Sequence, residues 1–262
     1  MRRTVEVKNM RPQEFLDAKK EFNVAYLPVG PIEWHGPHMP FGTDALQAEY
    51  VALHVAEELG GVVFPTLFFG TERARTPEYV KRMGFEDENT YVVGMDVPGV
   101  MVRSMYFPEE LFGSILRAYL EQIIAYGFDK VYIINGHGAD GQISTCERLS
   151  RELSHDTDTE VIYLMCLDKL DENDVSLGHA NISETSNMMC VREDNVDLSQ
   201  LPPKPEKIYT YKYGIADSLL FQGKGQPDFS VVNDPRDASS ELGKRYLDAG
   251  IKKVVEYIKN HK

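Results

Sequence analysis

The segment LPVGPIEWHGPHMPFGTD, residues 27–44, constrains the fold of this chain more than any other stretch. It overlaps a short apolar run of strand length, residues 24–29, and leads into residues 45–59, where apolar side chains recur every three or four positions as in a helix. A strand, a turn rich in glycine and proline, and a helix therefore follow one another. In an open α/β sheet, ligands bind at the carboxyl edge of the strands, so this segment is a candidate binding site.

Four side chains of this segment offer oxygen and imidazole ligands, namely Glu33, His35, His38 and Asp44. Glu33 and His35 are two residues apart, so they project to the same side of an extended chain. The glycines and prolines that follow can turn the chain and bring Asp44 toward this pair. A mixed carboxylate and imidazole set suits zinc, manganese or iron better than calcium or magnesium. The segment therefore indicates a transition-metal site, and the alternative is a polar surface loop in which the histidines cap turns.

A second polar cluster, NGHGAD, follows the buried-strand pattern at residues 130–135 and precedes a helical pattern. Its glycines allow the backbone to approach a ligand closely, and His137 stands at the same kind of strand end as the first cluster. We therefore predict that His137 is a further ligand. The turn also matches the GxGxxG pattern of dinucleotide-binding proteins, through Gly136, Gly138 and Gly141. The bulky histidine within that pattern and its position in the middle of the chain argue against NAD binding, which stays a remote alternative.

A third cluster, GHANISETS, spans residues 178–186. His179 is expected in a loop, and Ser183 or Thr185 can cap the helix that follows, with Glu184 in its first turn. On its own, Glu184 could simply complement the dipole of that helix. Beside two other clusters of histidine and carboxylate, His179 and Glu184 become candidates for the same site.

The chain, residues 1–262, alternates strands with helices and predicts one α/β domain, a three-layer α/β/α sandwich with a mostly parallel sheet. The expected strands are residues 23–30, 62–67, 130–135 and 161–167. The expected helices are residues 12–20, 44–59, 108–128, 142–153, 183–191 and 239–260. Two segments lack clear periodicity, residues 68–102 and 193–237. The first is a candidate substrate lid, and the alternatives are a solvated loop or an oligomer contact.

Composition and charge narrow the range of partners. The chain has 28 Lys and Arg against 41 Asp and Glu, a net charge of −13, whereas nucleic acids and anionic membranes require a basic face. The three cysteines are far apart and form no CxxC pair, so neither a disulfide framework nor a structural zinc site is expected. No apolar run approaches membrane-spanning length. We expect a cytoplasmic enzyme that acts on a small-molecule substrate.

Three of these segments resemble the creatininase (creatinine amidohydrolase) family of metal-dependent hydrolases. The resemblance covers LPVGPIEWHGPHMPFGTD, VYIINGHGAD and HANISETS, in the family's order and approximate spacing, and spans most of residues 23–191. It implies an α/β/α fold and a homo-oligomer, often a hexamer assembled from dimers. It also implies hydrolysis of a cyclic amide or formamide, or ring opening of a cyclic diketone.

The resemblance further implies two divalent transition-metal ions per subunit, of zinc, manganese or iron. The metal ligands that it implies are Glu33, His35, Asp44 and His137, with the aspartate bridging the ions. Glu33 and His137 would complete one site, and His35 with Glu184 the other. The resemblance also implies that His179 is the general acid or base.

The chain also departs from creatininase itself. Creatininase has a metal-binding glutamate at the position of Ala139, so the second ion would need Glu184, Asp140 or additional water. The family's usual asparagine is replaced by Asp140. Creatininase closes tryptophans over its substrate, whereas the only tryptophan here is Trp34. These departures argue against creatinine as the substrate.

The expected function is a binuclear metal-dependent hydrolase of a small polar cyclic amide or formamide, which is attacked by a hydroxide that bridges the two ions. His179 would protonate the leaving group. The alternative reaction at the same centre is hydrolysis of a C–C bond in a cyclic 1,3-diketone, such as an oxidised inositol. Arg73 and Arg75 are candidate anchors for a hydroxylated or anionic substrate, or surface charges. Alternatives from other classes are an NAD-dependent oxidoreductase and a non-catalytic metal-binding oligomer.

Overall fold

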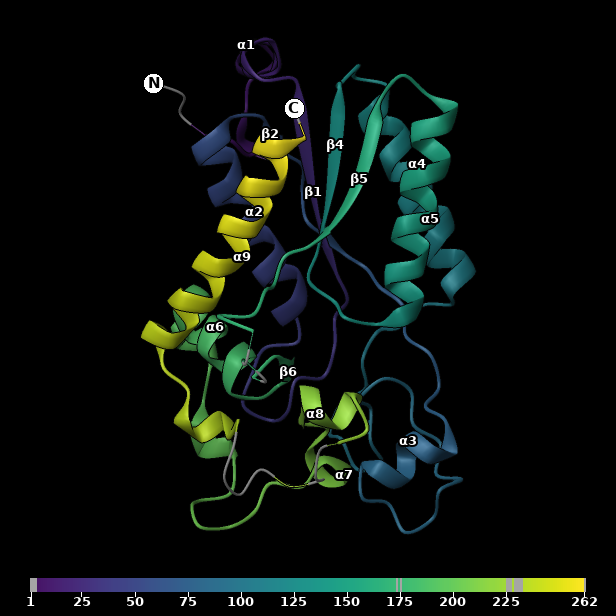
Figure 1. Ribbon diagram of the computed structural model, residues 1–262, viewed down its shortest axis with the longest axis vertical. Coiled ribbons are helices and arrows are strands. Elements are labelled where there is room, and N and C mark those ends of the chain that lie inside the picture. Colours follow the sequence, from purple (N-terminus) through teal and green to yellow (C-terminus); the bar gives the residue numbers. More distant parts are fainter. Residues whose placement is uncertain (1–3, 173, 175, 225–227, 229–232, 262) are drawn as a thin grey trace.

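The computed structural model describes residues 4–172, 174, 176–224, 228 and 233–261, so parts of the expected 1–262 domain and of the 193–237 segment lie outside the described residues. Figure 1 shows a central sheet with helices on both sides. The strands lie in the order β2-β1-β4-β5 and pair in parallel, and the short β3 is also parallel to β1. Their bounds are β1 Val24–Gly30, β2 Val62–Val63, β3 Leu67–Phe68, β4 Lys130–Asn135 and β5 Glu160–Met165.

Two layers of helices cover the two faces of the sheet. Their bounds are α1 Pro12–Glu21, α2 Thr43–Leu59, α4 Glu109–Ile124, α5 Asp140–Asp156, α6 Ile182–Arg192 and α9 Ser240–Asn260. Tyr26 and Tyr132 pack on one face with α2 and α9, whereas Leu27 and Ile133 pack on the other with α1, α4 and α5. Every residue of β1 is buried, as expected for a parallel strand covered on both faces. The predicted α/β fold with a mostly parallel sheet is therefore confirmed.

One predicted strand is wrong in its extent. Residues 62–67 form two short strands, β2 and β3, rather than one continuous strand. Pro65 lies between them and has no N–H group to donate, so the pairing with β1 is interrupted. The other predicted strands and long helices are present, and their ends differ by a few residues. Within the described residues, every helix is too short or too polar to span a bilayer.

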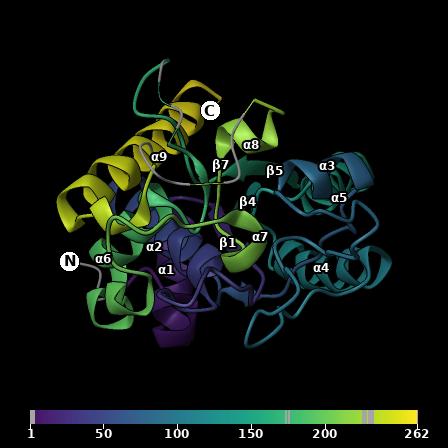
Figure 2. The same ribbon diagram turned by 90° about the horizontal axis from the view of Figure 1, so that it is seen from below.

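The two segments that lack periodicity contain short elements, and these gather beyond the carboxyl ends of the strands (Figures 1 and 2). Residues 68–102 contain α3 Pro77–Arg82. Residues 193–237 contain α7 Thr210–Tyr213, β7 Ala216–Asp217 and α8 Ser218–Phe221. Strand β7 pairs antiparallel with β6 Gly178–His179. Short 3-10 helices occur at Val7–Asn9, Glu193–Asn195, Leu198–Gln200 and Pro235–Asp237. Both segments thus reach the edge of the sheet that carries the polar clusters.

Candidate metal centre

Two glycines at the carboxyl ends of neighbouring strands allow the first turn of α2 to lie against the sheet. A Cβ at Gly136, just after β4, would collide with the carbonyl oxygen of Asp44. A Cβ at Gly30, the last residue of β1, would lie 2.6 Å from the amide nitrogen of Ala45. Both approaches are too close for any larger residue. Asp44 is therefore held at the two strand ends, and only 2% of it is exposed.

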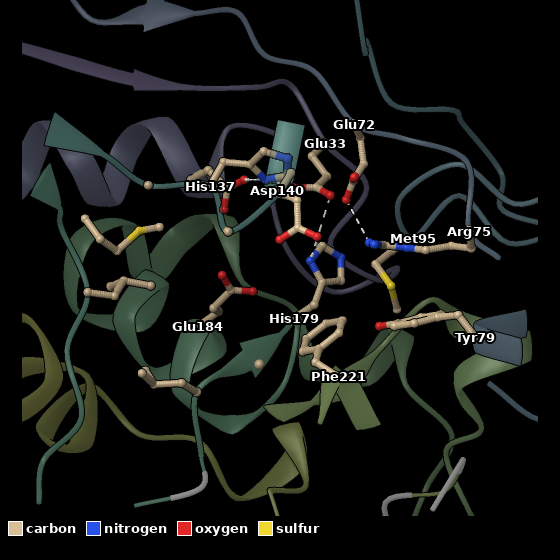
Figure 3. Close-up of a pocket in the computed structure, with 18 residues that line it drawn as sticks. Glu33, Glu72, Arg75, Tyr79, Met95, His137, Asp140, His179, Glu184 and Phe221 are labelled. Carbon is tan, nitrogen blue, oxygen red and sulfur yellow. Dashed lines mark hydrogen bonds and ion pairs between the residues drawn. The ribbon is translucent and has the colours of Figure 1, made fainter. Parts of the chain in front are cut away.

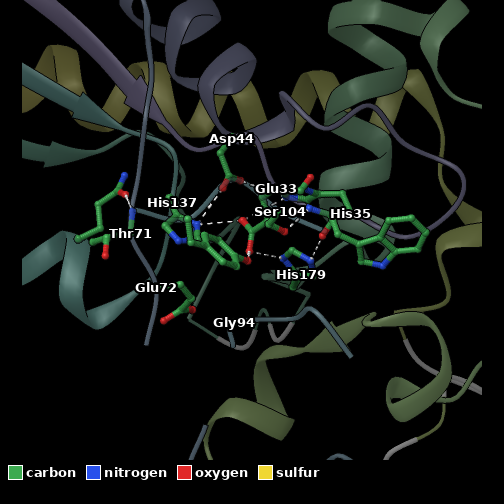
Figure 4. Close-up of polar contacts among 12 residues, drawn as sticks. Glu33, His35, Asp44, Thr71, Glu72, Gly94, Ser104, His137 and His179 are labelled. Carbon is green, nitrogen blue, oxygen red and sulfur yellow. Dashed lines mark hydrogen bonds and ion pairs between the residues drawn. The ribbon is translucent and has the colours of Figure 1, made fainter. Parts of the chain in front are cut away.

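Asp44 joins two groups of side chains, one through each carboxylate oxygen (Figure 4). Its Oδ2 lies 2.8 Å from Nδ1 of His137, and that nitrogen lies 3.0 Å from Oε2 of Glu33. Its Oδ1 lies 3.2 Å from Nε2 of His35, and that nitrogen lies 3.5 Å from Oε2 of Glu184. All these side chains are buried. In each group of three, the possible ligand atoms lie within 4.8 Å of one another.

The distances and the atom types fit metal ions. Zinc binds nitrogen and oxygen ligands at about 2.0–2.2 Å, so the ligand atoms around one ion lie roughly 3–3.5 Å apart. The atoms of both groups are close to that separation. In addition, Oε2 of Glu33 is buried, and apart from its ion-pair contact with Nδ1 of His137 it has no hydrogen-bond partner among the described residues. A buried carboxylate oxygen in this state is suited to bind a cation.

The centre carries an excess of negative charge. Burial by itself would lower the pKa of His35, but Asp44 and Glu184 outweigh this effect and raise the pKa to about 10. Burial, together with the nearby Asp44, raises the pKa of Glu184 to about 7 despite the attraction of His35. The raised pKa values of His35 and Glu184 have one cause, namely that several buried carboxylates lie together with too little positive charge around them. Divalent cations would supply that charge.

His179 lies beside these groups, and one hydrogen bond fixes its tautomer. Its Nε2 lies 2.7 Å from the carbonyl oxygen of Trp34, which can only accept, so Nε2 carries the proton. Nδ1 is then an acceptor, and it lies 4.0 Å from Oε1 of Glu33. Burial and the neighbouring His35 lower the pKa of His179 to about 3, which keeps the ring neutral. His179 is thus neutral in this state, with Nδ1 unprotonated and able to accept a hydrogen bond at the edge of the centre.

Tyr106 belongs to the site, although sequence analysis did not identify it. Its hydroxyl donates to Oε1 of Glu33 over 2.5 Å, and its ring stacks beside that of His137. Gly94 makes room for it, because a Cβ at that position would collide with the Tyr106 hydroxyl. Tyr106 and Glu33 are 73 residues apart, and no periodicity or motif marks the tyrosine.

Asn135 holds the glycine turn that carries His137. Its Oδ1 accepts from the backbone N–H of His137 and from Nε2 of Gln142, and its Nδ2 donates to the His137 carbonyl. Gln142 accepts in turn from the backbone N–H of Thr71 (Figure 4). The turn is therefore tied both to α5 and to the segment that follows β3.

The first turn of α6 positions Glu184. Asn181 caps this helix, because its side chain accepts from the backbone N–H of Ser183 at 3.1 Å. The prediction that Ser183 or Thr185 is the cap is therefore wrong. Oε2 of Glu184 accepts from the backbone N–H of Ala180 over 2.6 Å, and the residue is only 4% exposed. The carboxylate is directed toward His35 rather than toward solvent.

Two other side chains that were considered as ligands lie outside the two groups around Asp44. His38 is buried, but its Nε2 contacts Oγ1 of Thr185 at 2.9 Å instead of joining the groups around Asp44. Asp140 is the first residue of α5 and is exposed. Of the two acids considered for the second ion, Glu184 and not Asp140 lies beside His35.

The centre opens into a cavity of about 380 Å³ (Figure 3). One side of the cavity is lined by Glu33, Asp44, His137, His179 and Glu184. Residues 68–102 and 193–237 provide the opposite wall, through Arg75, Tyr79, Met95 and Phe221. A cavity of this size admits a small molecule. The segment 68–102 therefore forms part of the wall of the candidate site.

Comparison with known proteins points to one family. The model of the creatininase family, described as creatinine amidohydrolase, matches residues 8–258. Creatinine amidohydrolase from Pseudomonas putida is 23% identical to this chain over 257 residues, which cover 90% of this chain and 88% of that protein.

Solved structures share the fold. A structure called creatininase Mn has a TM-score of 0.67 and 20% identity, with 99% of each chain covered. A mutant creatininase of Zn-Zn type has a TM-score of 0.68 and 20% identity, with 99% of this chain and 98% of that chain covered. At this identity, the likeness to these structures concerns the fold alone.

Proposed function

The chain belongs to the creatininase family of amidohydrolases, and from this premise we propose that it hydrolyses a small polar cyclic amide or formamide at a centre of two divalent metal ions. The observation that carries the proposal is the position of Asp44, whose two oxygens face two separate groups of side chains. Glu33 and His137 would hold one ion with Asp44, and His35 and Glu184 would hold the other. The manganese and Zn-Zn creatininase structures make manganese and zinc the first metals to test, before iron.

The side chains of this protein provide proton transfer and positioning. When bound, a pair of divalent ions supplies polarisation of a carbonyl group and acidification of water. Nδ1 of His179 would accept a proton from the attacking water and deliver it to the leaving nitrogen as the C–N bond breaks, because Nε2 is engaged with the Trp34 carbonyl. Tyr106 orients Glu33 by donating to Oε1, which leaves Oε2 to bind a cation.

A metal-dependent assay tests this proposal. The purified protein is stripped of metal with a chelator, reloaded with manganese or zinc, and assayed against cyclic amides, N-formyl amines and cyclic 1,3-diketones. We expect ring opening or formate release that requires the added metal. Hydrolysis that persists in the stripped protein contradicts the proposal. Turnover of the diketones alone would favour the alternative reaction, in which the proton from His179 goes to carbon.

We also propose that the chain forms a homo-oligomer. Met101, Val102 and Met105 lie within five consecutive residues and are 73%, 54% and 55% exposed. Large apolar side chains exposed to this extent are suited to a contact between subunits. Light scattering on the purified protein should give a mass that is a multiple of that of the chain, and a monomeric mass would contradict this proposal.

A further inference from the structure

The wall of the cavity opposite the candidate metal centre carries an arginine, Arg75 (Figure 3). Arg73 and Arg75 are equivalent candidates in the sequence, and the structure separates them. The side chain of Arg73 is 55% exposed and pairs with Glu109 on the surface. The side chain of Arg75 is 20% exposed and lines the cavity. Only Arg75 is therefore placed to contact a molecule bound at the centre.

Three contacts hold the guanidinium of Arg75 in place. Nε donates to the carbonyl oxygen of Gly94 over 2.8 Å, and Nη2 donates to Oε2 of Glu72 over 2.7 Å. Cζ lies over the ring of Tyr79, 4.8 Å from its centroid. The side chain of Glu72 is only 4% exposed, so this ion pair is largely shielded from water. A side chain that is fixed in this way loses little conformational entropy when it binds a ligand.

The charges around Arg75 favour a neutral ligand group over an anion. Glu72 already compensates the guanidinium, and the carboxylate of Asp140 lines the same cavity. An anionic group placed at Arg75 would have to compete with Glu72 for the guanidinium. A carbonyl oxygen only accepts a hydrogen bond. A guanidinium has five N–H donors. The bonds to Gly94 and Glu72 use two of them, so three remain for a ligand carbonyl.

The cavity wall beside Arg75 is largely aromatic and apolar. Tyr79 and Phe221 stack with their centroids 6.1 Å apart and their planes 28° apart, and Met95 lines the same cavity. Aromatic and thioether groups make favourable contacts with planar rings. The cavity thus combines an apolar surface, a hydrogen-bond donor from Arg75 and, on its other side, the candidate metal centre.

We propose that Arg75 is a specificity-determining residue that donates a hydrogen bond to a second carbonyl oxygen of a neutral, planar ring substrate. The substrate class is then cyclic imides and related rings with two carbonyl groups, in preference to simple lactams. This inference rests on the proposed function, because it concerns the molecule that would be hydrolysed in the same cavity.

A pair of probes isolates the second carbonyl group. Succinimide and 2-pyrrolidinone are both five-membered rings with an N–H group, and they differ by one carbonyl. Their Kd values for the metal-loaded protein are measured by ligand-observed NMR, alongside assays of ring opening. A hydrogen bond from a charged donor corresponds to a factor of about ten or more in affinity, so we expect succinimide to bind at least about tenfold more tightly.

Matched substitutions then assign the preference to Arg75. Arg75→Met removes the donors but keeps an apolar stem on Tyr79, and it should reduce the preference for succinimide about tenfold. Arg73→Met, the same change on the exposed arginine, should leave the preference unchanged. If Arg75→Met impairs folding because Glu72 loses its partner, the double variant Glu72→Gln with Arg75→Met removes that unpaired charge and serves instead.

Binding and turnover separate this inference from the proposed function. An Arg75-dependent preference without ring opening supports the inference and contradicts the proposed function. Ring opening together with a preference for succinimide that the folded Arg75 variants retain supports the proposed function and contradicts the inference. A protein with native Arg75 that does not distinguish the two probes, or binds neither, also overturns the inference.

Discussion

His179 donates a hydrogen bond from Nε2 to the main-chain carbonyl of Trp34 over 2.7 Å, which joins two segments that are far apart in the sequence. Trp34 lies between Glu33 and His35, so its carbonyl is fixed by the same backbone that positions those two side chains. Its indole Nε1 donates to the carbonyl of Tyr213, which anchors the other end of the residue. The imidazole therefore has a defined tautomer, and Nδ1 remains as the acceptor.

Replacing His179 with Asn should abolish turnover and leave metal binding intact. Loss of a general acid or base reduces kcat by about 10²–10⁴-fold. Elemental analysis of the purified variant should give the same metal content as the unsubstituted protein. His155→Asn is the control, since that side chain is 89% exposed on α5. Loss of metal together with activity would instead make His179 a ligand, beside Glu33 and His35.

Tyr106→Phe should weaken metal binding without removing a ligand. The phenol holds Oε1 of Glu33, and groups that orient metal ligands contribute about 10–100-fold in affinity. Competition with a chelator of known affinity measures this change. Tyr126→Phe is the matched control, because Tyr126 is 57% exposed. Equal metal affinity in both variants would show that Tyr106 does not position Glu33.

Gly136→Ala should displace the first turn of α2 and with it Asp44. A Cβ at this position collides with the backbone of Asp44, so we expect a loss of about 1–3 kcal/mol in the free energy of unfolding and weaker metal binding. Gly138→Ala lies in the same turn, where a Cβ meets no described atom within 4 Å. Denaturant titration should therefore show a large effect for the first variant and a small one for the second. Equal losses of stability in the two variants would contradict the close approach of Asp44 to Gly136.

Alkaline pH should destabilise the fold through Tyr26 and Tyr132, whose rings stack in the core with centroids 5.8 Å apart. Burial raises the pKa of both phenols, and neither hydroxyl has a hydrogen-bond partner among the described residues. The unfolded chain releases these protons near pH 10, about the ordinary value for tyrosine, whereas the folded chain keeps them. Their contribution to stability is therefore complete below about pH 10 and is lost as the pH rises through the folded-state pKa.

Tyr26→Phe tests this dependence. The variant should be about as stable as the unsubstituted protein at neutral pH, because no hydrogen bond of the described residues is removed, and its stability should fall less steeply above pH 10. Urea titrations at pH 7 to 11 measure both quantities. An unchanged slope with pH would contradict the role assigned to the buried phenol.

The layers of the fold were predictable because hydrophobic periodicity reports directly on burial. The apolar run of β1 and the repeats of α2 and α9 identify elements that are covered by their neighbours. The break between β2 and β3 was missed, because residues 62–67 are apolar enough to suggest one strand. The break arises where Pro65 faces β1, since proline has no N–H group for the strand pairing.

The site was predictable to the extent that its residues fall at strand ends and in motifs. His38 shows the limit of that reasoning, since it lies among Glu33, His35 and Asp44 in the sequence but contacts Thr185 in the fold. Tyr106 shows the opposite limit, because its contact with Glu33 depends on a long irregular segment that carries no periodic pattern. The choice between Glu184 and Asp140 likewise depends on how α6 is placed, which the local sequence does not specify.

The central claim is that Asp44 bridges two metal ions, and the metal stoichiometry of Asp44→Asn tests it most directly. Asp140→Asn, an exposed acid at the edge of the same cavity, is the control and should bind as many ions as the unsubstituted protein. Titration with zinc or manganese, followed by elemental analysis and thermal unfolding, gives the number of ions bound and their effect on Tm. We expect two ions in the control, loss of both from Asp44→Asn, and a Tm in that variant that does not respond to added metal. Two tightly bound ions in Asp44→Asn would contradict it.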